Sequence, residues 1–362
     1  MFWSILIFFL VLSILVIVHE FGHYIVAKKN GILVEEFGFG LPPRIFGKKI
    51  GETLWSINLL PFGGFVKLHG EMSEEGVTKK ERAFVYKSKK IKIAVIVAGV
   101  IMNFLLGIFA FAIVYSFSGI PKNTEVVKIL DITTNSPAQL AKLIVGDIVK
   151  KVDGEEVKSV SEFVTKVESK KGKKITLDLG DRKVSLVPRI NPPQGEGSLG
   201  VTISSTEIYF PAVWQRPFYG AYYGFKEALF WGKNVVVGFY TIFTDMFNGQ
   251  SPKDISGPVG VFAITSEVAK TGILPLINLL GIISVNLAIL NILPFPALDG
   301  GRLLFIFIEK VIGRKVIPKV EVAIHSIGMI ILLGLILAIT IKDIRGLISA
   351  GSISGFLENM VK

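Results

Sequence analysis

Four long apolar stretches dominate the sequence, and they restrict the fold more than any other feature. Residues 2–18 are apolar apart from two serines, and similar stretches cover about 93–117, 273–293 and 323–341. A run of about 18 or more apolar residues is long enough to cross a bilayer as a helix. The composition agrees, because only 19% of the residues are charged, whereas soluble domains carry about 25%. The sequence therefore predicts a polytopic α-helical membrane protein with four transmembrane helices.

The charges beside the first stretch predict the orientation of the chain. Lys28 and Lys29 follow this stretch, and no positive charge precedes it apart from the amino terminus, which disfavours a secretory signal peptide. Because positive loops stay in the cytoplasm, we expect the N-terminus outside and residue 28 inside. The net charge of +11 lies in loops beside apolar stretches. This placement favours topology signals or contact with membrane lipid, and no nucleic-acid partner is expected.

The polar segments predict the remaining domains. Alternating apolar residues with Gly and Pro at 35–70 predict strands and a β-hairpin, with Gly63 and Gly64 at a turn or bulge. A Lys-rich segment with short β-branched runs predicts one small α/β domain. A helix at 212–248 could span the membrane or lie on it. The predicted division has four parts. Residues 1–118 contain two membrane helices and the hairpin region, and 119–192 form the small domain. Residues 193–272 form a linker with a membrane-surface helix, and 273–362 contain two more membrane helices.

One short motif, His19-Glu20-Phe21-Gly22-His23, carries the clearest chemical signal. Histidines at i and i+4 lie on one face of a helix, so both imidazoles can bind one zinc ion, and Glu20 can act on a zinc-bound water. Ionisable groups are costly at the end of a membrane helix, which favours function over a cluster that only faces lipid headgroups. The absence of cysteine excludes disulfides, thiolate ligands and a cysteine nucleophile.

A catalytic zinc ion needs a third protein ligand. Asp299 stands out, because it follows the third apolar stretch between two prolines and two glycines. The alternative is that Asp299 only caps a helix that begins near Arg302. Topology offers an independent test, since the third stretch brings Asp299 to the depth of the two histidines only if 212–248 does not cross the membrane. We therefore expect 212–248 to be an amphipathic helix on the outer face.

Together these motifs resemble the site-2 protease family of intramembrane zinc metalloproteases, and within it the bacterial regulator-of-sigma-E protease branch. The resemblance covers nearly the whole chain, because the motifs occur in the same order as in that family. They are His19-Glu20-Phe21-Gly22-His23, Leu60-Pro61-Phe62-Gly63-Gly64-Phe65-Val66-Lys67, Ala98-Gly99-Val100-Ile101-Met102-Asn103-Phe104, Ser256-Gly257-Pro258, Asn286-Leu287-Ala288-Ile289-Leu290-Asn291 and Leu298-Asp299-Gly300-Gly301.

The resemblance implies roles for individual residues. Zn²⁺ would be held by His19, His23 and Asp299, with Glu20 as the catalytic base. Substrate contacts are implied for Asn291, Asn103, Asn286, Gly63, Gly64 and Phe65. The hairpin is implied to be membrane-associated, and 119–192 to be a single extracytoplasmic PDZ-like domain, whereas some members of the branch carry two. These domains bind peptide ends or block access to the protease, and the alternative is a spacer.

The predicted function is intramembrane proteolysis in the bacterial cytoplasmic (inner) membrane, with the active site towards the cytoplasm. Zinc would activate water and Glu20 would transfer its proton. The resemblance implies single-span membrane proteins as substrates, such as trimmed anti-sigma factors or signal-peptide remnants. An edge strand of the hairpin could hold the unwound substrate, or the hairpin could only anchor the protein.

A zinc transporter or an inactive protease-like scaffold is the alternative function. A transporter would carry further ionisable groups along its membrane helices, and the second to fourth apolar stretches hold few of them. A scaffold would not need Glu20. Both arguments favour the protease over the transporter and the scaffold.

Overall fold

The computed structural model describes residues 2–71, 76–193, 195–249, 256–314 and 316–361. They form two compact units. The first unit combines Met1–Phe117 with Trp214–Lys362, and the second is Ser118–Val213. All the residues expected to bind metal or substrate belong to the first unit.

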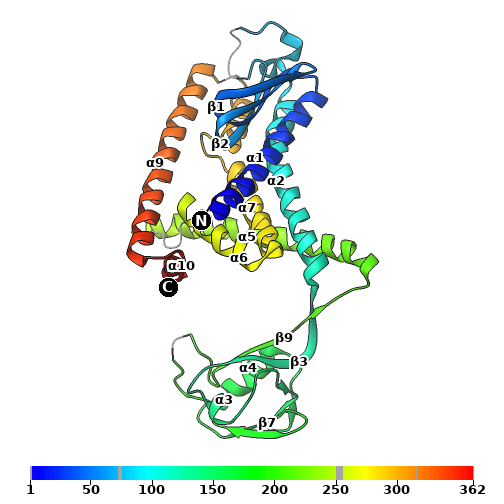
Figure 1. The fold of residues 1–362 in the computed structure, drawn as a ribbon, viewed down its shortest axis with the longest axis vertical. Coiled ribbons are helices and arrows are strands. Elements are labelled where there is room, and N and C mark those ends of the chain that lie inside the picture. The colour runs from blue at the N-terminus through cyan, green and yellow to red at the C-terminus, as the bar shows by residue number, and fades with distance from the viewer. Residues whose placement is uncertain (1, 72–75, 194, 250–255, 315, 362) are drawn as a thin grey trace. The chain divides into compact units, whose positions relative to one another are not determined.

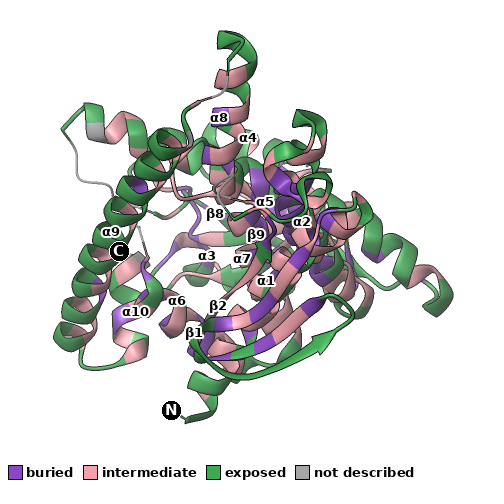
Figure 2. Ribbon diagram, turned by 90° about the horizontal axis from the view of Figure 1, so that it is seen from above, coloured by how far each residue is buried: buried purple, intermediate pink, exposed green. Residues whose placement is uncertain are grey.

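Four helices in the described residues are long and apolar enough to cross a membrane, and they cover the four predicted stretches. They are α1 (Phe2–Lys29), α2 (Lys89–Ser118), α7 (Ile273–Ile292) and α9 (Pro318–Ala350). In Figure 1, α1 and α2 cross each other, and they come into close contact at Gly22 and Ala98. Helix α9 is the least buried of the four, and Figure 2 shows it exposed along most of its length. An apolar helix that buries so little surface against protein is typical of a helix that faces lipid.

The first unit also contains shorter or more polar helices. They are α5 (Arg216–Phe247), α6 (Pro258–Thr271), α8 (Asp299–Ile312) and α10 (Ile353–Val361), with 3-10 turns at Lys80–Arg82, Phe84–Tyr86 and Val213–Gln215. Helix α5 lies within the predicted helix at 212–248. The hydroxyl of Tyr115 on α2 donates to the carboxylate of Glu227 at 2.9 Å, which fixes α5 against α2.

Helix α6 is not predicted from the sequence, and a distant residue specifies its start. The backbone N–H groups of Gly257 and Gly260 donate to Oδ2 of Asp343 on α9, at 2.9 Å each. These groups would otherwise be unpaired, as at any helix start. Asp343 is 83 and 86 positions away in sequence from its two donors. The local signal is Pro258 at the first helical turn.

Strands β1 (Val34–Ile50) and β2 (Thr53–Leu68) pair antiparallel around a two-residue turn. Gly51 has a φ of +63°, which the first position of such a turn requires and which glycine adopts without strain. The guanidinium of Arg82 donates to both carboxylate oxygens of Glu52, at 2.7 Å each. These two bonds fasten the turn to the segment that precedes α2.

Both strands bend, so the first part of β1 lies between two separate parts of β2. The second half of β1 pairs with the first half of β2, whereas residues 36–39 pair with 54–57 and also with 64–67. The last part of β2, residues 64–68, therefore lies at an edge among the described strands. Strand β2 packs against α1, which brings this edge close to the His19-Glu20-Phe21-Gly22-His23 motif (HExxH).

The second unit contains two small sheets and two helices. The first sheet has the order β4-β3-β9, with β3 (Ile120–Ile132), β4 (Ile148–Val149) and β9 (Val201–Tyr209). The second has the order β6-β5-β7-β8, with β5 (Lys151–Val152), β6 (Glu155–Glu156), β7 (Ile175–Asp178) and β8 (Lys183–Leu186). Helices α3 (Pro137–Leu140) and α4 (Val160–Glu168) complete it. Its core includes Val127, Val149, Phe163 and Leu177.

A side-chain cap and a proline specify the start of α3. Oγ of Ser136 accepts from the N–H of Gln139 at 3.2 Å, and Pro137 occupies the first turn. The C-terminal boundary of the unit differs from the expected 119–192, because β9 pairs with β3 and extends the unit to Val213. The segment after 192 is thus only in part a linker.

Candidate metal centre

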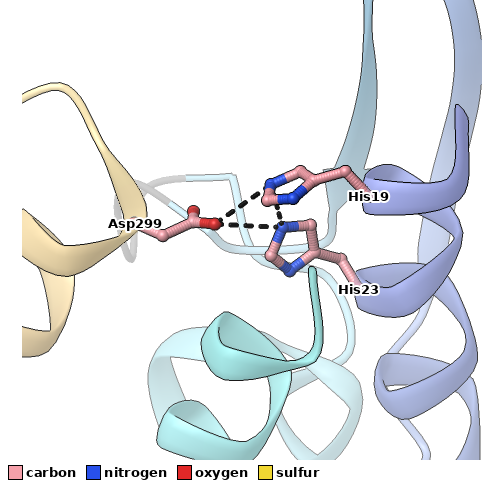
Figure 3. A group of neighbouring side chains, drawn as sticks. All are labelled: His19, His23 and Asp299. Carbon is pink, nitrogen blue, oxygen red and sulfur yellow. Dashed lines mark hydrogen bonds and ion pairs between the residues drawn. The ribbon is translucent and has the colours of Figure 1, made fainter. Parts of the chain in front are cut away.

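Helix α1 carries both histidines of the HExxH motif on one face. The Nε2 atoms of His19 and His23 are 3.2 Å apart. Asp299, in the first turn of α8, places Oδ2 3.1 Å from Nε2 of His19 and 3.4 Å from Nε2 of His23. Figure 3 shows both imidazoles pointing towards this carboxylate. The structure thus brings together the three side chains that the sequence proposes as metal ligands, with exposures of 12%, 13% and 19%.

The spacing of these three atoms fits a zinc ion. A tetrahedral zinc ion with bonds of about 2.0–2.1 Å holds its ligand atoms about 3.3–3.4 Å apart. The observed separations are 3.2, 3.1 and 3.4 Å. Oδ2 of Asp299 is buried, and no group in the described residues donates a well-directed hydrogen bond to it. Two imidazole nitrogens and a carboxylate oxygen are also ligand types of catalytic zinc sites.

The capping alternative for Asp299 is wrong. Helix α8 begins at Asp299 and its N-cap is Leu298, and no side chain among the described residues caps it. The carboxylate of Asp299 is directed at the histidines of α1.

Two glycines let α1 and α2 approach closely enough for this arrangement. A Cβ at Gly22 would lie 2.4 Å from the carbonyl oxygen of Ala98, and a Cβ at Gly99 would lie 2.4 Å from Nε2 of His23. Real Cβ atoms essentially never make contacts under 3.0 Å. Each helix therefore presents a glycine where the other passes. The position of Gly99 beside the imidazoles depends on helix packing, which no local sequence signal reveals.

The other ring nitrogens are held by α2. Nδ1 of His23 lies 2.8 Å from the carbonyl oxygen of Val95, which can only accept, so Nδ1 carries the proton and Nε2 keeps a free electron pair. Nδ1 of His19 lies 3.4 Å from the side-chain amide of Asn103. The backbone oxygen of Asn103 in turn accepts from Oγ of Ser284 on α7, at 2.7 Å. Such contacts orient a metal-binding imidazole.

A cavity of about 190 Å³ adjoins the three side chains. Glu20 and Phe65 line it together with His19, His23 and Asp299. This volume exceeds the roughly 30 Å³ that one water occupies. A Cβ at Gly64 would lie 3.5 Å from Cγ of Glu20. The edge of β2 therefore passes directly beside Glu20.

An ion pair that the sequence analysis missed borders the same cavity. Arg302 on α8 donates to the carboxylate of Glu71, and both residues also line a neighbouring cavity of about 200 Å³. Burial alone would lower the pKa of Arg302, but the negative charge of Glu71 outweighs it and raises the pKa above its ordinary value. Arg302 stays positively charged at neutral pH. It follows Asp299 by three positions, a spacing that places both on one helix face and could have revealed it.

The other predicted contact residues differ in position. Phe65 lines the cavity and Gly64 lies beside Glu20. Gly63 has a φ of +79° and lies nearer to Leu41 than to the metal centre. Asn286 and Asn291 belong to α7 and do not line the cavity in the described residues.

Comparison with known proteins agrees with this geometry. The family described as peptidase family M50 matches residues 7–335. Zinc metalloprotease RasP of Geobacillus kaustophilus is 31% identical over 94% of this chain and 98% of its own length. Regulator of sigma-W protease RasP of Bacillus subtilis is 28% identical over 95% of this chain and 99% of its own length. A relative from Clostridium perfringens is 35% identical over 92% of this chain and 96% of its own length. The chain therefore belongs to peptidase family M50, the site-2 protease family, and is a zinc metalloprotease.

Proposed function

We propose that this protein is an intramembrane endopeptidase that cleaves peptide bonds within or near the transmembrane segments of single-span membrane proteins. One observation carries the proposal: His19, His23 and Asp299 converge on a cavity that Glu20 also lines. Both metal-binding helices belong to a unit with four helices of membrane-spanning length. A protease site built on such helices acts on substrates in the same membrane.

Each residue has a separate task in this proposal. His19, His23 and Asp299 would hold the zinc ion. Bound zinc supplies Lewis-acid chemistry, because it lowers the pKa of water and polarises the scissile carbonyl group. Glu20 lies on the same turn of α1 and on the cavity wall, where it accepts the proton of the attacking water and passes it to the leaving amine nitrogen. Val95 holds the ring of His23 with its proton on Nδ1.

The edge of β2 is the proposed holder of the substrate. A transmembrane helix satisfies its own backbone hydrogen bonds, so it must unwind before it can be cut. Residues 64–68 form an edge beside Glu20, and an extended peptide can add to such an edge as another strand. Phe65 then faces the substrate from the cavity wall. The exposed second half of β1, residues 41–50, supports membrane association of this hairpin.

The same comparisons support a membrane location and a class of substrate. We assign the protein to the bacterial cytoplasmic membrane, with the metal centre towards the cytoplasm and the second unit, a PDZ-like domain, outside. The name of the Bacillus subtilis relative refers to regulation of sigma-W, which supports anti-sigma factors and similar membrane proteins as substrates. Helix α5 is proposed to lie on the outer membrane surface, because its exposed aromatic residues fit the interface.

The substitution Glu20→Gln tests the mechanism. It removes the proton acceptor and keeps the size of the side chain, so the purified variant should retain zinc and lose about 10²- to 10⁴-fold in the rate of cleavage. The measurements are zinc content and cleavage of a single-span substrate in detergent. Glu52→Gln, at the hairpin turn, is the matched control and should cleave normally. Undiminished cleavage by Glu20→Gln would refute the assigned base.

A further inference from the structure

The loop between α7 and α8 delivers Asp299, and α9 supports this loop. Nδ1 of His325 on α9 accepts a hydrogen bond from the backbone N–H of Ala297, at 3.0 Å. A Cβ at Gly328, one turn further along α9, would lie 2.7 Å from the carbonyl oxygen of Pro296. Two points of α9 therefore touch the two residues of the loop that stand two and three positions before Asp299.

The loop holds Ala297 in a conformation that alanine disfavours. Its φ is +83°, in the left-handed region where a Cβ is crowded by the backbone. Such a residue keeps this conformation only when its surroundings impose it. The N–H of Ala297 is the group that His325 binds. The hydrogen bond thus acts on the strained residue of the loop.

The start of α8 follows the loop directly, so the loop conformation sets the position of Asp299. A Cβ at Gly300 would lie 2.0 Å from the carbonyl oxygen of Leu293, and one at Gly301 would lie 2.5 Å from that of Phe295. The first turn of α8 is thus packed against the loop backbone without space for a side chain. A change in the loop moves this turn, and the carboxylate of Asp299 moves with it.

His325 itself does not line the cavity of the metal centre. It lines the neighbouring cavity, and its ring lies 5.4 Å from the ring of Phe305 on α8. The backbone N–H can only donate, so Nδ1 of His325 must carry the free electron pair and its proton must reside on Nε2. Nε2 is buried and has no hydrogen-bond partner in the described residues. The hydrogen bond from Ala297 is therefore the polar contact that stabilises this histidine in a helix of membrane-spanning length.

We propose that His325 is a positioning residue for the metal centre, which holds the loop so that Asp299 completes the ligand set. This inference rests on the proposed role of Asp299 as a zinc ligand. His325 acts through one acceptor atom at the Nδ1 position. Its effect is on zinc affinity first, and on the rate of cleavage only through the zinc ion.

The variants His325→Asn and His325→Gln separate this role from simple packing. The side-chain oxygen of asparagine replaces Nδ1, whereas that of glutamine lies near the position of Nε2. We expect Asn to keep zinc affinity within about threefold, and Gln and His325→Leu to weaken it about 10- to 100-fold, the range for groups that orient metal ligands. The measurement is competition for zinc with a chromophoric chelator, on purified full-length protein in detergent, with melting temperature of the zinc-free protein as the folding control.

A second variant tests the strained residue directly. Ala297→Gly in the His325→Leu background should recover part of the lost zinc affinity, because glycine adopts a φ of +83° without strain. If His325→Leu binds zinc like the wild type, or if Asn and Gln weaken binding equally, the positioning role is refuted. If His325→Leu does not fold, the comparison of Asn with Gln decides.

A separate variant tests the assignment of Asp299 as a zinc ligand. Asp299→Ala should weaken zinc binding more than any variant at position 325. Wild-type zinc affinity in Asp299→Ala would overturn the assignment of Asp299 itself, whereas loss of zinc in that variant together with unchanged affinity in His325→Leu would overturn only the role of His325.

Discussion

The substitution Gly99→Ala tests whether the contact between α1 and α2 sets the metal geometry. The new Cβ would lie 2.4 Å from Nε2 of His23 and 2.7 Å from Cε1 of His19. Ordinary van der Waals contact begins at 3.4 Å, so the ring of His23 must move by about 1.0 Å (3.4 − 2.4), or the helices must separate by a similar amount. Distances in a zinc site tolerate about 0.2 Å. The displacement is several times that tolerance.

The expected result is selective loss of zinc. We expect affinity to fall at least about 10- to 100-fold. Overpacking should cost about 1–3 kcal/mol of folding free energy, offset by about 1 kcal/mol because alanine favours a helix more than glycine does. Zinc competition and thermal unfolding in detergent measure the two effects separately.

Gly107→Ala is the matched control on the same helix. Its Cβ would lie 2.6 Å from Cγ2 of Val285, a similar overlap away from the histidines. It should lower the melting temperature comparably and leave zinc affinity unchanged. The reasoning is refuted if Gly99→Ala binds zinc as tightly as the wild type, or if both variants lose zinc equally.

Two further predictions concern contacts outside the metal centre. Asp343→Ala leaves the N–H groups of Gly257 and Gly260 buried without their acceptor, which should cost on the order of 2–5 kcal/mol; an unchanged melting temperature would contradict the anchoring of α6. Hydrogen bonds from Arg82 lower the pKa of Glu52 from 4.5 to about 2, so this carboxylate stabilises the fold above pH 4.5 and the contribution disappears as the pH falls towards 2. The difference in stability between wild type and Glu52→Gln should shrink over this range, and a difference independent of pH would count against the stabilising role of the ion pair between Glu52 and Arg82.

The membrane helices and most of the metal centre could be predicted because their signals are local. A long apolar run specifies α1 or α9 without reference to the rest of the chain. The spacing of His19 and His23 follows from the helical repeat. Asp299 needed a further argument, that the third helix brings it to the same depth, and the structure places it there beside both imidazoles.

The missed elements depend on partners far away in sequence. The alternation of polar and apolar residues in β9 is weak, and the segment forms a strand through its pairing with β3. The start of α6 is hydrogen-bonded to Asp343, and the loop before Asp299 is hydrogen-bonded to His325. The sequence marks Asp343 and His325 as ionisable residues in or beside an apolar stretch, but it does not show which distant residues they contact.

The wide separation of the proposed zinc ligands in sequence delays assembly of the metal centre in the newly made protein. His23 and Asp299 are 276 positions apart (299 − 23). At about 5–20 residues per second, translation of the intervening chain takes roughly 14–55 s. For about the last two thirds of this interval α1 and α2 have already been made, yet the nascent chain has only two of its three ligands. With this proposed ligand set, proteolysis can begin only after α7 and α8 have been made, so neighbouring membrane proteins would not be exposed to a half-synthesised enzyme.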